Sequence, residues 1–364
     1  MERTLTIKAN YFADKLGYGV IIITTEGDIQ KPAYRLSDSI EVINLNINFE
    51  SIYGHNLLYK TILFSWKQIL YRKRLRRALK EIKADITVSM LRREINFISE
   101  IDDGSKKVGE MHFNRDNYRD FSTNSIPVGL KKILSKIWMN QLVRNLKKLD
   151  SFVVLSKEDR DKWVELEQVE VIYNPLPEFP EKISDCVNKT VIAAGRFVRQ
   201  KGFDMLLDAW VLVNDRHPEW NLEIYGNGAK DWFINRADEL GISDSVKFYD
   251  AVPDLNSKFA EASIFAFSSR YEGFGMVISE AMSCGLPPVA FACPCGPRDI
   301  ITHGIDGFLV APGDIEGLAE KICQLIDNES ARKEIGVAAR ASSERFKIEN
   351  IAKEWESLFT SLVN

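Results

Sequence analysis

Two loops in the second half of the chain carry residues that could bind a phosphorylated ligand. The first, Gly195-Arg196-Phe197-Val198-Arg199-Gln200-Lys201-Gly202, follows a predicted buried strand and precedes a predicted helix. Arg196 and Lys201 could converge on a diphosphate and neutralise the charge that develops on a departing phosphate. Gly195 and Gly202 would allow the loop to bend around it. A basic loop by itself is more often surface charge, so this prediction depends on the second loop.

The second loop, within residues 268–285, also leads from a strand into a helix. Gly273 and Gly275 let the backbone come close to a ligand, and the N–H groups of the first helical turn attract an anion. Glu272 precedes that turn, and Glu280 lies about two turns further along the helix. The two carboxylates would therefore bind different parts of an elongated ligand. Each glutamate taken alone is more simply a loop residue or a solvated helix residue.

Alternating strands and helices must position these loops. Short buried strands that alternate with amphipathic helices are typical of parallel α/β sheets. The pattern predicts two doubly wound, Rossmann-like domains that face each other across a cleft, with the ligand outside the carboxyl ends of the strands. We expect an acceptor-side domain over 1–172, a donor-binding domain over 173–347, and a helix over 348–364 that crosses back to the first domain. Strands are predicted at 19–25, 41–45, 86–89, 107–112 and 151–155, and then at 190–194, 221–225, 246–249, 263–267, 288–291 and 308–310.

Length and composition indicate a soluble globular protein. The 364 residues suit two domains, and hydrophobic and charged contents of 45% and 27% are ordinary for such proteins. No apolar run reaches the roughly 18 residues that a membrane span requires, and the first residues lack the apolar core of a signal peptide. The five cysteines are scattered and odd in number, which argues against a disulfide framework and for the reducing cytoplasm.

The positive charge is concentrated in the first half. Residues 1–172 hold 29 basic and 23 acidic side chains, whereas the remainder holds 19 and 29. The segment Lys60–Lys83 contains nine bases and one acid, and Lys131–Lys148 contains six bases and no acid. Such blocks are more often solvated helix faces. Interleaved with apolar residues at helical spacing, they also fit a helix that lies on the anionic inner face of the cell membrane. No nucleic-acid-binding motif accompanies the charge, so nucleic acid is not an expected partner.

No metal site is predicted. The four histidines are dispersed, and Cys293 and Cys295 lack the second ligand pair of a structural zinc site. Asp159 and Asp161 have the spacing of an acid pair in metal-dependent transferases. Because they follow Ser156 after a strand, helix capping explains them more simply.

These features together resemble the nucleotide-sugar glycosyltransferases of family 4, which have the two-domain GT-B architecture. The resemblance covers most of the chain and is strongest from Val191 to Pro312. It rests on the Gly-Arg…Lys-Gly loop, on the glutamates at 272 and 280, and on the Cys-Gly-Leu-Pro-Pro-Val stretch at 284–289. Two further motifs follow in the expected order, Cys-Gly-Pro-Arg-Asp-Ile-Ile at 295–301 and Gly-Ile-Asp-Gly-Phe-Leu-Val at 304–310.

The resemblance implies a role for individual residues. Arg196 and Lys201 would grip the pyrophosphate of the donor. Glu272 would lie against the hydroxyls of the transferred sugar, and Glu280 would accept hydrogen bonds from the ribose hydroxyls. His112 matches a histidine near the donor sugar and the acceptor, although a lone histidine at a strand end is more often a packing residue. The phosphate site would be completed by backbone N–H groups of Gly273, Phe274, Gly275 and Met276, and Gly195 also belongs to the donor-binding set.

The implied reaction is retaining transfer of a hexose or N-acetylhexosamine from a UDP-sugar to a glycan or lipid-linked acceptor in surface polysaccharide synthesis. In the usual account the leaving phosphate accepts the proton of the acceptor on the same face. The carboxylate pair of a glycosidase is then unnecessary, and no metal or other cofactor is implied. Two alternatives remain open: a catalytically impaired relative that only binds nucleotide-sugar or membrane, and a sugar-nucleotide epimerase, which would need no acceptor.

The sequence departs from the family pattern near residue 1. Family members usually open with a strand and a glycine-rich loop, followed by a helix that begins much like Glu2–Ile7. We therefore expect the N-terminal domain to lack its central first strand and the loop that faces the donor phosphates. Either the natural chain is longer or this short form has impaired activity, because buried neighbours of a missing strand would leave backbone groups unpaired at a cost of about 1 kcal/mol or more each. A smaller departure is Asp250, where relatives often have glycine near the nucleotide base.

Overall fold

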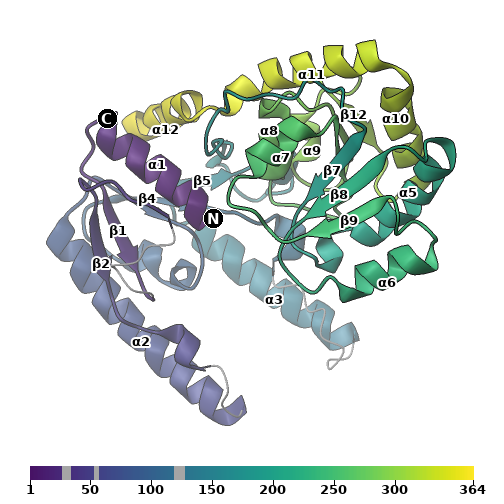
Figure 1. The fold of residues 1–364 in the computed structure, drawn as a ribbon. Coiled ribbons are helices and arrows are strands. Elements are labelled where there is room, and N and C mark those ends of the chain that lie inside the picture. Colours follow the sequence, from purple (N-terminus) through teal and green to yellow (C-terminus); the bar gives the residue numbers. More distant parts are fainter. Residues whose placement is uncertain (27–33, 53–56, 119–127) are drawn as a thin grey trace. The chain divides into compact units, whose positions relative to one another are not determined.

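The computed structural model describes residues 1–26, 34–52, 57–118 and 128–364, and it divides into two compact units (Figure 1). Unit 1 comprises Met1–Val154, Arg160–Pro177 and Ile348–Asn364, and unit 2 comprises Leu155–Asp159 and Glu178–Lys347. Every strand pair described is parallel, so the predicted α/β class is confirmed. The sequence predicts a boundary after residue 172, and unit 1 runs on to Pro177. Tyr173 packs against the core that contains Trp355 of the C-terminal helix.

Unit 2 is built on one six-stranded sheet in the order β12-β11-β10-β7-β8-β9. The chain starts in the middle of this sheet, adds β8 and β9 on one side of β7, and then places β10, β11 and β12 on the other. The order therefore reverses between β7 and β10, and ligands of open α/β sheets bind at such a point. The strands are β7 (Thr190–Ala194), β8 (Asn221–Tyr225), β9 (Val246–Tyr249), β10 (Ile264–Phe267), β11 (Pro288–Phe291) and β12 (Phe308–Val310).

Amphipathic helices bury their apolar faces on this sheet. On α5 (Phe203–Arg216), the residues Phe203, Leu206, Leu207 and Val213 are all buried and form the apolar stripe of an amphipathic helix. Their side chains join those of the strands in one hydrophobic core. The other helices assigned to the second half are α4 (Lys157–Arg160), α6 (Asp231–Glu239), α7 (Leu255–Glu261), α8 (Met276–Ser283), α9 (Pro297–Ile300), α10 (Ile315–Asp327) and α11 (Glu329–Ser343).

Unit 1 contains two separate parallel sheets. One has the two strands β1 (Ile21–Thr24) and β2 (Glu41–Asn44). The other has four strands in the order β3-β4-β5-β6. Its strands are β3 (Ile86–Ser89), β4 (Lys106–Glu110), β5 (Ser151–Val154) and β6 (Val169–Val171).

Helices cover both faces of the four-stranded sheet. Phe152 and Val154 of β5 belong to the core that includes α2 (Leu57–Ile82) and α3 (Val128–Leu146). Val153, which points to the opposite face, packs in a second core with α12 (Ile348–Val363). The ring of Phe359 on α12 lies 5.8 Å from that of Phe12 on α1 (Glu2–Asp14). The C-terminal helix is thus part of unit 1. Within the described ranges, no helix combines the length and the apolar character that crossing a bilayer would require.

Candidate functional site

The loop between β7 and α5 is pressed against the loop that follows β10. Because β7 and β10 are hydrogen-bonded neighbours, the loops at their carboxyl ends meet. Gly202 has a left-handed φ of 65°, and a Cβ on it would lie 2.0 Å from the carbonyl oxygen of Ser268. The Ser268 hydroxyl in turn donates a hydrogen bond of 2.9 Å to the carbonyl of Lys201. Only glycine allows this contact.

Further hydrogen bonds fix the two loops to each other. The Arg270 backbone N–H donates to the Gln200 carbonyl at 2.8 Å, and Gln200 Nε2 donates to the Tyr271 carbonyl at 2.9 Å. The Arg270 guanidinium donates two hydrogen bonds to Asp204, at 2.7 and 2.6 Å. Burial alone would raise the pKa of Asp204, but the hydrogen bonds and charge of Arg270 outweigh it and lower that pKa. A charged clamp therefore ties the second loop to the start of α5.

Lys201 and Glu272 meet where the two loops join. Lys201 Nζ donates to Glu272 Oε1 at 2.7 Å, and the two side chains are only 15% and 9% exposed. The Lys201 side chain lies against Gly195, where an added Cβ would be 3.1 Å from its Cδ. Arg196 follows Gly195 with an exposed side chain, which forms no ion pair with any described residue. The site thus holds two cations. Lys201 is paired with a carboxylate, and Arg196 is exposed and has no ion pair among the described residues.

The N-terminus of α8 opens three residues after Glu272. Gly275 occupies the N-cap with φ 90°, so no capping side chain covers the amides of the first turn. The partial positive charge of this helix end favours an anion. The preceding backbone is held by the loop after β11, since the Glu272 N–H donates to the Pro294 carbonyl at 3.1 Å. A Cβ on Gly296 would lie 1.7 Å from the Phe274 carbonyl oxygen, so this approach also requires glycine.

A third loop, after β8, packs against the loop that contains Gly195 and Phe197. A Cβ on Gly226 would lie 1.7 Å from the carbonyl oxygen of Gly195. The Phe197 N–H donates to the Asn227 carbonyl at 2.8 Å. In the sequence, Gly226-Asn227-Gly228 lacks the third glycine of a dinucleotide fingerprint. Its contact with the Gly195 loop could not be predicted from the sequence, where a glycine at the end of a strand was the one feature that pointed to a close backbone contact.

Glu280 and Asp250, which the resemblance also associates with the donor, lie on α8 and directly after β9. Glu280 is buried on α8. Asp250, at the end of β9, is exposed and accepts a hydrogen bond of 2.7 Å from Lys230. Near it the rings of Tyr225 and Tyr249 stack with their centroids 4.7 Å apart.

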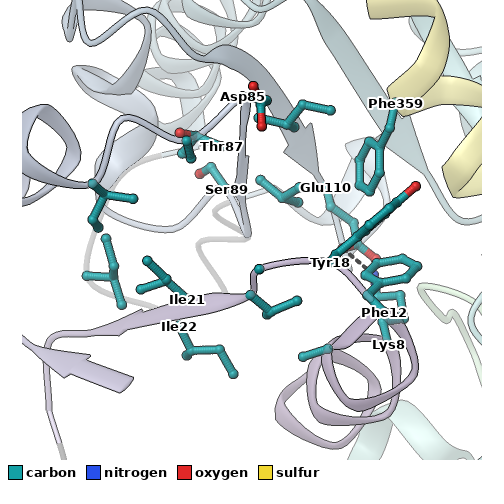
Figure 2. Close-up of a pocket in the computed structure, with 18 of the residues that line it drawn as sticks. Lys8, Phe12, Tyr18, Ile21, Ile22, Asp85, Thr87, Ser89, Glu110 and Phe359 are labelled. Carbon is teal, nitrogen blue, oxygen red and sulfur yellow. Dashed lines mark hydrogen bonds and ion pairs between the residues drawn. The ribbon is translucent and has the colours of Figure 1, made fainter. Parts of the chain in front are cut away.

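His112 belongs to unit 1 and lies beside the buried ion pair of Lys8 and Glu110. Figure 2 shows the two partners of that pair. Lys8 Nζ donates to both carboxylate oxygens of Glu110 at 2.5 Å. His112 Nε2 lies 3.2 Å from Glu110 Oε1, close enough for charge interaction but without hydrogen-bond geometry. Burial would raise the pKa of Glu110, but the charges of Lys8 and His112 outweigh it and lower that pKa to about 2. The sequence marked His112 but not its partners, because the contact with Lys8 depends on how α1 packs.

The structure brings part of the predicted set together. Lys201, Glu272 and Gly195 are in contact, and Arg196 shares their loop. Gly273, Phe274, Gly275 and Met276 connect Glu272 to α8, which carries Glu280. Across the described part of the chain, no group of three His, Cys, Asp or Glu side chains is placed to hold a metal ion. At the predicted acid pair, the Ser156 hydroxyl accepts a hydrogen bond of 3.1 Å from the Asp159 N–H. Ser156 thus caps the N-terminus of α4.

Comparison with known proteins agrees with this geometry. Residues 179–342, nearly all of unit 2, match the family described as glycosyl transferases group 1. An uncharacterized glycosyltransferase of Haemophilus influenzae is 27% identical over 374 residues, which cover 94% of this chain and 99% of that protein. The chain is a GT-B glycosyltransferase.

Two further similarities concern this glycosyltransferase. The amylovoran biosynthesis glycosyltransferase AmsD of Erwinia amylovora is 32% identical over 186 residues, about half of either protein (51% of this chain and 52% of AmsD). The crystal structure of Anabaena HepE in complex with UDP and glucose superimposes with a TM-score of 0.72 at 19% identity. That superposition covers 99% of the glycosyltransferase and 95% of HepE. At this identity the likeness concerns the fold.

Proposed function

We propose that this glycosyltransferase moves a hexose or N-acetylhexosamine from a UDP-sugar to a glycan or lipid-linked acceptor in surface polysaccharide synthesis, with retention of anomeric configuration. The observation that carries the donor half is the Lys201–Glu272 pair at the topological switch point of unit 2. The nucleotide and sugar in the HepE complex support a UDP-sugar, and the naming of AmsD for amylovoran biosynthesis supports a polysaccharide product.

The donor pyrophosphate would occupy the space between Arg196, Lys201 and the first turn of α8. An arriving diphosphate would compete with Glu272 for the Lys201 ammonium, and the exposed Arg196 could move onto it. Glu272 would then be released toward the hydroxyls of the transferred sugar. In the reaction, both cations and the helix end would stabilise the negative charge that grows on the leaving UDP.

The proposed arrangement of charges supports a retaining reaction without a carboxylate pair. Glu272 is held by a lysine and Glu280 lies about two turns away, so these two carboxylates do not form the close pair of a retaining glycosidase. The leaving phosphate would instead accept the proton of the acceptor hydroxyl on the face where the new bond forms. His112 would sit near the reacting sugar. No metal takes part in this scheme.

Incubating the protein with UDP-glucose or UDP-N-acetylglucosamine and lipid-linked glycan acceptors tests the proposal. We expect a product with the anomeric configuration of the donor by NMR, and equal rates with and without EDTA. Interconversion of the donor without transfer would identify an epimerase. Donor binding without any product would identify a binding protein.

Glu280→Gln should weaken UDP binding without changing the fold. Glutamine keeps the shape of the side chain but removes the charge that accepts the proposed ribose hydrogen bonds. Hydrogen bonds to charged groups contribute about 1.5–3 kcal/mol, so titration calorimetry should show a Kd raised by roughly 10- to 100-fold. An unchanged Kd with an unchanged melting temperature would remove the ribose assignment of Glu280.

The acceptor half of the proposal concerns an anionic membrane surface and helix α2. One exposed face of α2 carries Ile62, Trp66 and Ile69, whose side chains are 57–69% exposed. The same face continues with Lys73, Arg76 and Lys80, all exposed. Apolar side chains next to bases are typical of helices that lie in a membrane interface. Of the second predicted basic block, Lys131 and Lys132 have side chains outside the described part.

Replacing Lys73, Arg76 and Lys80 by glutamine should release the protein from anionic vesicles. These three are better choices than their neighbours, because Arg72 pairs with Glu100 and Arg74 donates to backbone carbonyls of the β2 loop. Each base near an anionic surface contributes about 1 kcal/mol, so sedimentation with phosphatidylserine vesicles should show a loss of roughly 100-fold in affinity.

The matched control neutralises Lys15, Lys247 and Lys353, which are exposed on other elements. If both triple variants lose binding equally, the attraction is a property of net charge. Equal retention by both would contradict the membrane role of α2.

A further inference from the structure

The loop between β11 and α9 contacts Glu272 of the candidate site. The Pro294 carbonyl accepts a hydrogen bond of 3.1 Å from the Glu272 N–H. Cys293 is fully buried, and burial together with the charge of Glu272 raises the pKa of its thiol. Cys295 has a φ of 64°, which is unfavourable for a residue that carries a Cβ. The loop therefore holds a strained residue directly after its contact with Glu272.

Two consecutive carboxylates of α4 hold Cys295 in this conformation. Glu158 Oε2 accepts a hydrogen bond of 3.2 Å from the Cys295 backbone N–H. The Cys295 thiol donates to Asp159 Oδ1 at 3.9 Å, and both of these residues are buried. Glu158 Oε2 also accepts a hydrogen bond of 3.1 Å from the Arg298 guanidinium on α9. Cys295 is thus held at its backbone and at its side chain.

A bond in the opposite direction joins the start of α4 to α9. The first N–H groups of a helix have no partner inside that helix, and the Lys157 N–H at the start of α4 donates to Asp299 Oδ1 at 3.1 Å. These contacts all lie within unit 2. The segment Leu155–Asp159 belongs to that unit, whereas the chain up to Val154 and from Arg160 to Pro177 belongs to unit 1. The short segment therefore contributes its two carboxylates to the unit that carries Glu272.

One peptide group connects Glu158 to Glu272. The Pro294 carbonyl and the Cys295 N–H belong to the same planar, trans peptide unit, so the two groups point in opposite directions. The carbonyl accepts from the Glu272 N–H, and the N–H donates to Glu158. Rotation of this plane would break both hydrogen bonds at once.

The strain at Cys295 favours such a rotation. A flip of the peptide plane changes ψ of Pro294 and φ of Cys295 together, because these are the two dihedrals on either side of the plane. It would let Cys295 leave its left-handed conformation and would turn the Pro294 carbonyl away from Glu272. The hydrogen bond to the charged Glu158 carboxylate opposes the flip, since such bonds are stronger than neutral ones.

We propose that Glu158 is a positioning residue for the transfer reaction: it keeps the Pro294–Cys295 peptide group from flipping and thereby holds Glu272 in place. This inference rests on the proposed function, in which Glu272 binds the transferred sugar. The pyrophosphate would be held by Arg196 and Lys201 on another loop. Loss of Glu158 should therefore impair the chemical step more than the binding of UDP.

Replacing Glu158 by alanine tests the proposal. Misplacement of a reacting group by about 1 Å can cost roughly 100-fold in rate, so we expect kcat for sugar transfer to fall by roughly 10- to 100-fold, with the Kd of UDP unchanged. Glu158→Gln, which keeps an acceptor for the Cys295 N–H, should give an intermediate kcat. The matched control is Glu320→Ala, which removes a carboxylate that pairs with Arg216 at 2.8 Å on the same unit. It should transfer sugar at the normal rate.

Hydrogen exchange of the Glu272 amide gives a readout that needs no transferase activity. This N–H should exchange roughly tenfold faster in Glu158→Ala, because its acceptor is lost by local opening, while the amides of β7 keep their rates. Equal exchange at Glu272 in Glu158→Ala and in the Glu320→Ala control would overturn the proposal. Faster exchange throughout unit 2 would also overturn it, because Glu158 would then only stabilise the fold.

Substitutions at residue 295 in the Glu158→Ala background test the flip itself. Glycine adopts a φ near 64° without strain, so Cys295→Gly should restore much of the protection of Glu272 and of kcat. Cys295→Ala removes the same thiol but keeps the strain, and it should restore neither. Equal effects of glycine and alanine would contradict the flip. If the unaltered protein transfers no sugar, the proposed function fails, and the exchange of the Glu272 amide still decides whether Glu158 positions that residue.

Discussion

Replacing Arg196 and Lys201 together by alanine should reduce glycosyl transfer below detection. In the proposed reaction negative charge grows on the leaving UDP, and Arg196 and Lys201 are the two cations assigned to its pyrophosphate. Loss of one preorganised stabilising group in an active site costs about 10²–10³ in kcat. Loss of both side chains should reduce kcat by more than about 10⁴-fold, even if their effects overlap. Radiolabelled sugar transfer measured at saturating donor checks this.

The control for that variant is Arg199→Ala combined with Lys247→Ala. It removes the same charge from two exposed side chains of unit 2 that form none of the ion pairs described. This control should transfer sugar at the normal rate. A double variant that still turns over would dismiss the pyrophosphate assignment.

Replacing Lys8 by methionine should destabilise unit 1 more than any surface substitution. Glu110 is almost fully buried, and Lys8 is the cation that contacts both of its oxygens. Removing one partner of a buried ion pair costs about 3–5 kcal/mol, because the other charge is left uncompensated. Hydrogen exchange of the β4 and β5 amides under native conditions measures this. The double variant Lys8→Met with Glu110→Leu should recover much of the loss, and a failure to recover would mean that the two residues act separately.

The same pair gives unit 1 a defined acid sensitivity. The pKa of Glu110 in the folded protein is about 2, below its ordinary value of 4.5. A carboxyl whose folded pKa is depressed stabilises the fold fully above the unfolded pKa, and this contribution disappears as the pH falls from 4.5 toward 2. In Glu110→Gln, the stability of unit 1 should therefore change less steeply across this window. An identical slope would contradict the role assigned to Glu110.

The regular elements were largely accessible from the sequence. The strands at 190–194, 221–225, 246–249, 288–291 and 308–310 have the predicted bounds. Apolar runs that end at glycine, proline or charged residues define such elements locally. The strand predicted at 107–112 spans Lys106–Glu110 instead.

The contacts of the site were less accessible. Spacing indicated that Arg196, Lys201 and Glu272 act on one ligand, but not that Lys201 pairs with Glu272. That contact depends on the adjacency of β7 and β10, strands 70 or more residues apart in the chain, and adjacency is a tertiary property. The glycines at 226 and 296 were missed for the same reason, since each is required by a carbonyl from another loop. The roles of His112 and Glu280 remain predictions.

The close backbone contacts at Gly202, Gly226 and Gly296 have a consequence for donor recognition. Four loops are in van der Waals contact through their main chains, with no flexible side chains between them, so none can shift alone. The donor then meets a template whose shape is set before binding, and little ordering entropy is lost when it docks. Selectivity among donor nucleotides should accordingly resist changes in surrounding surface residues and respond sharply to a single added methyl at residue 226.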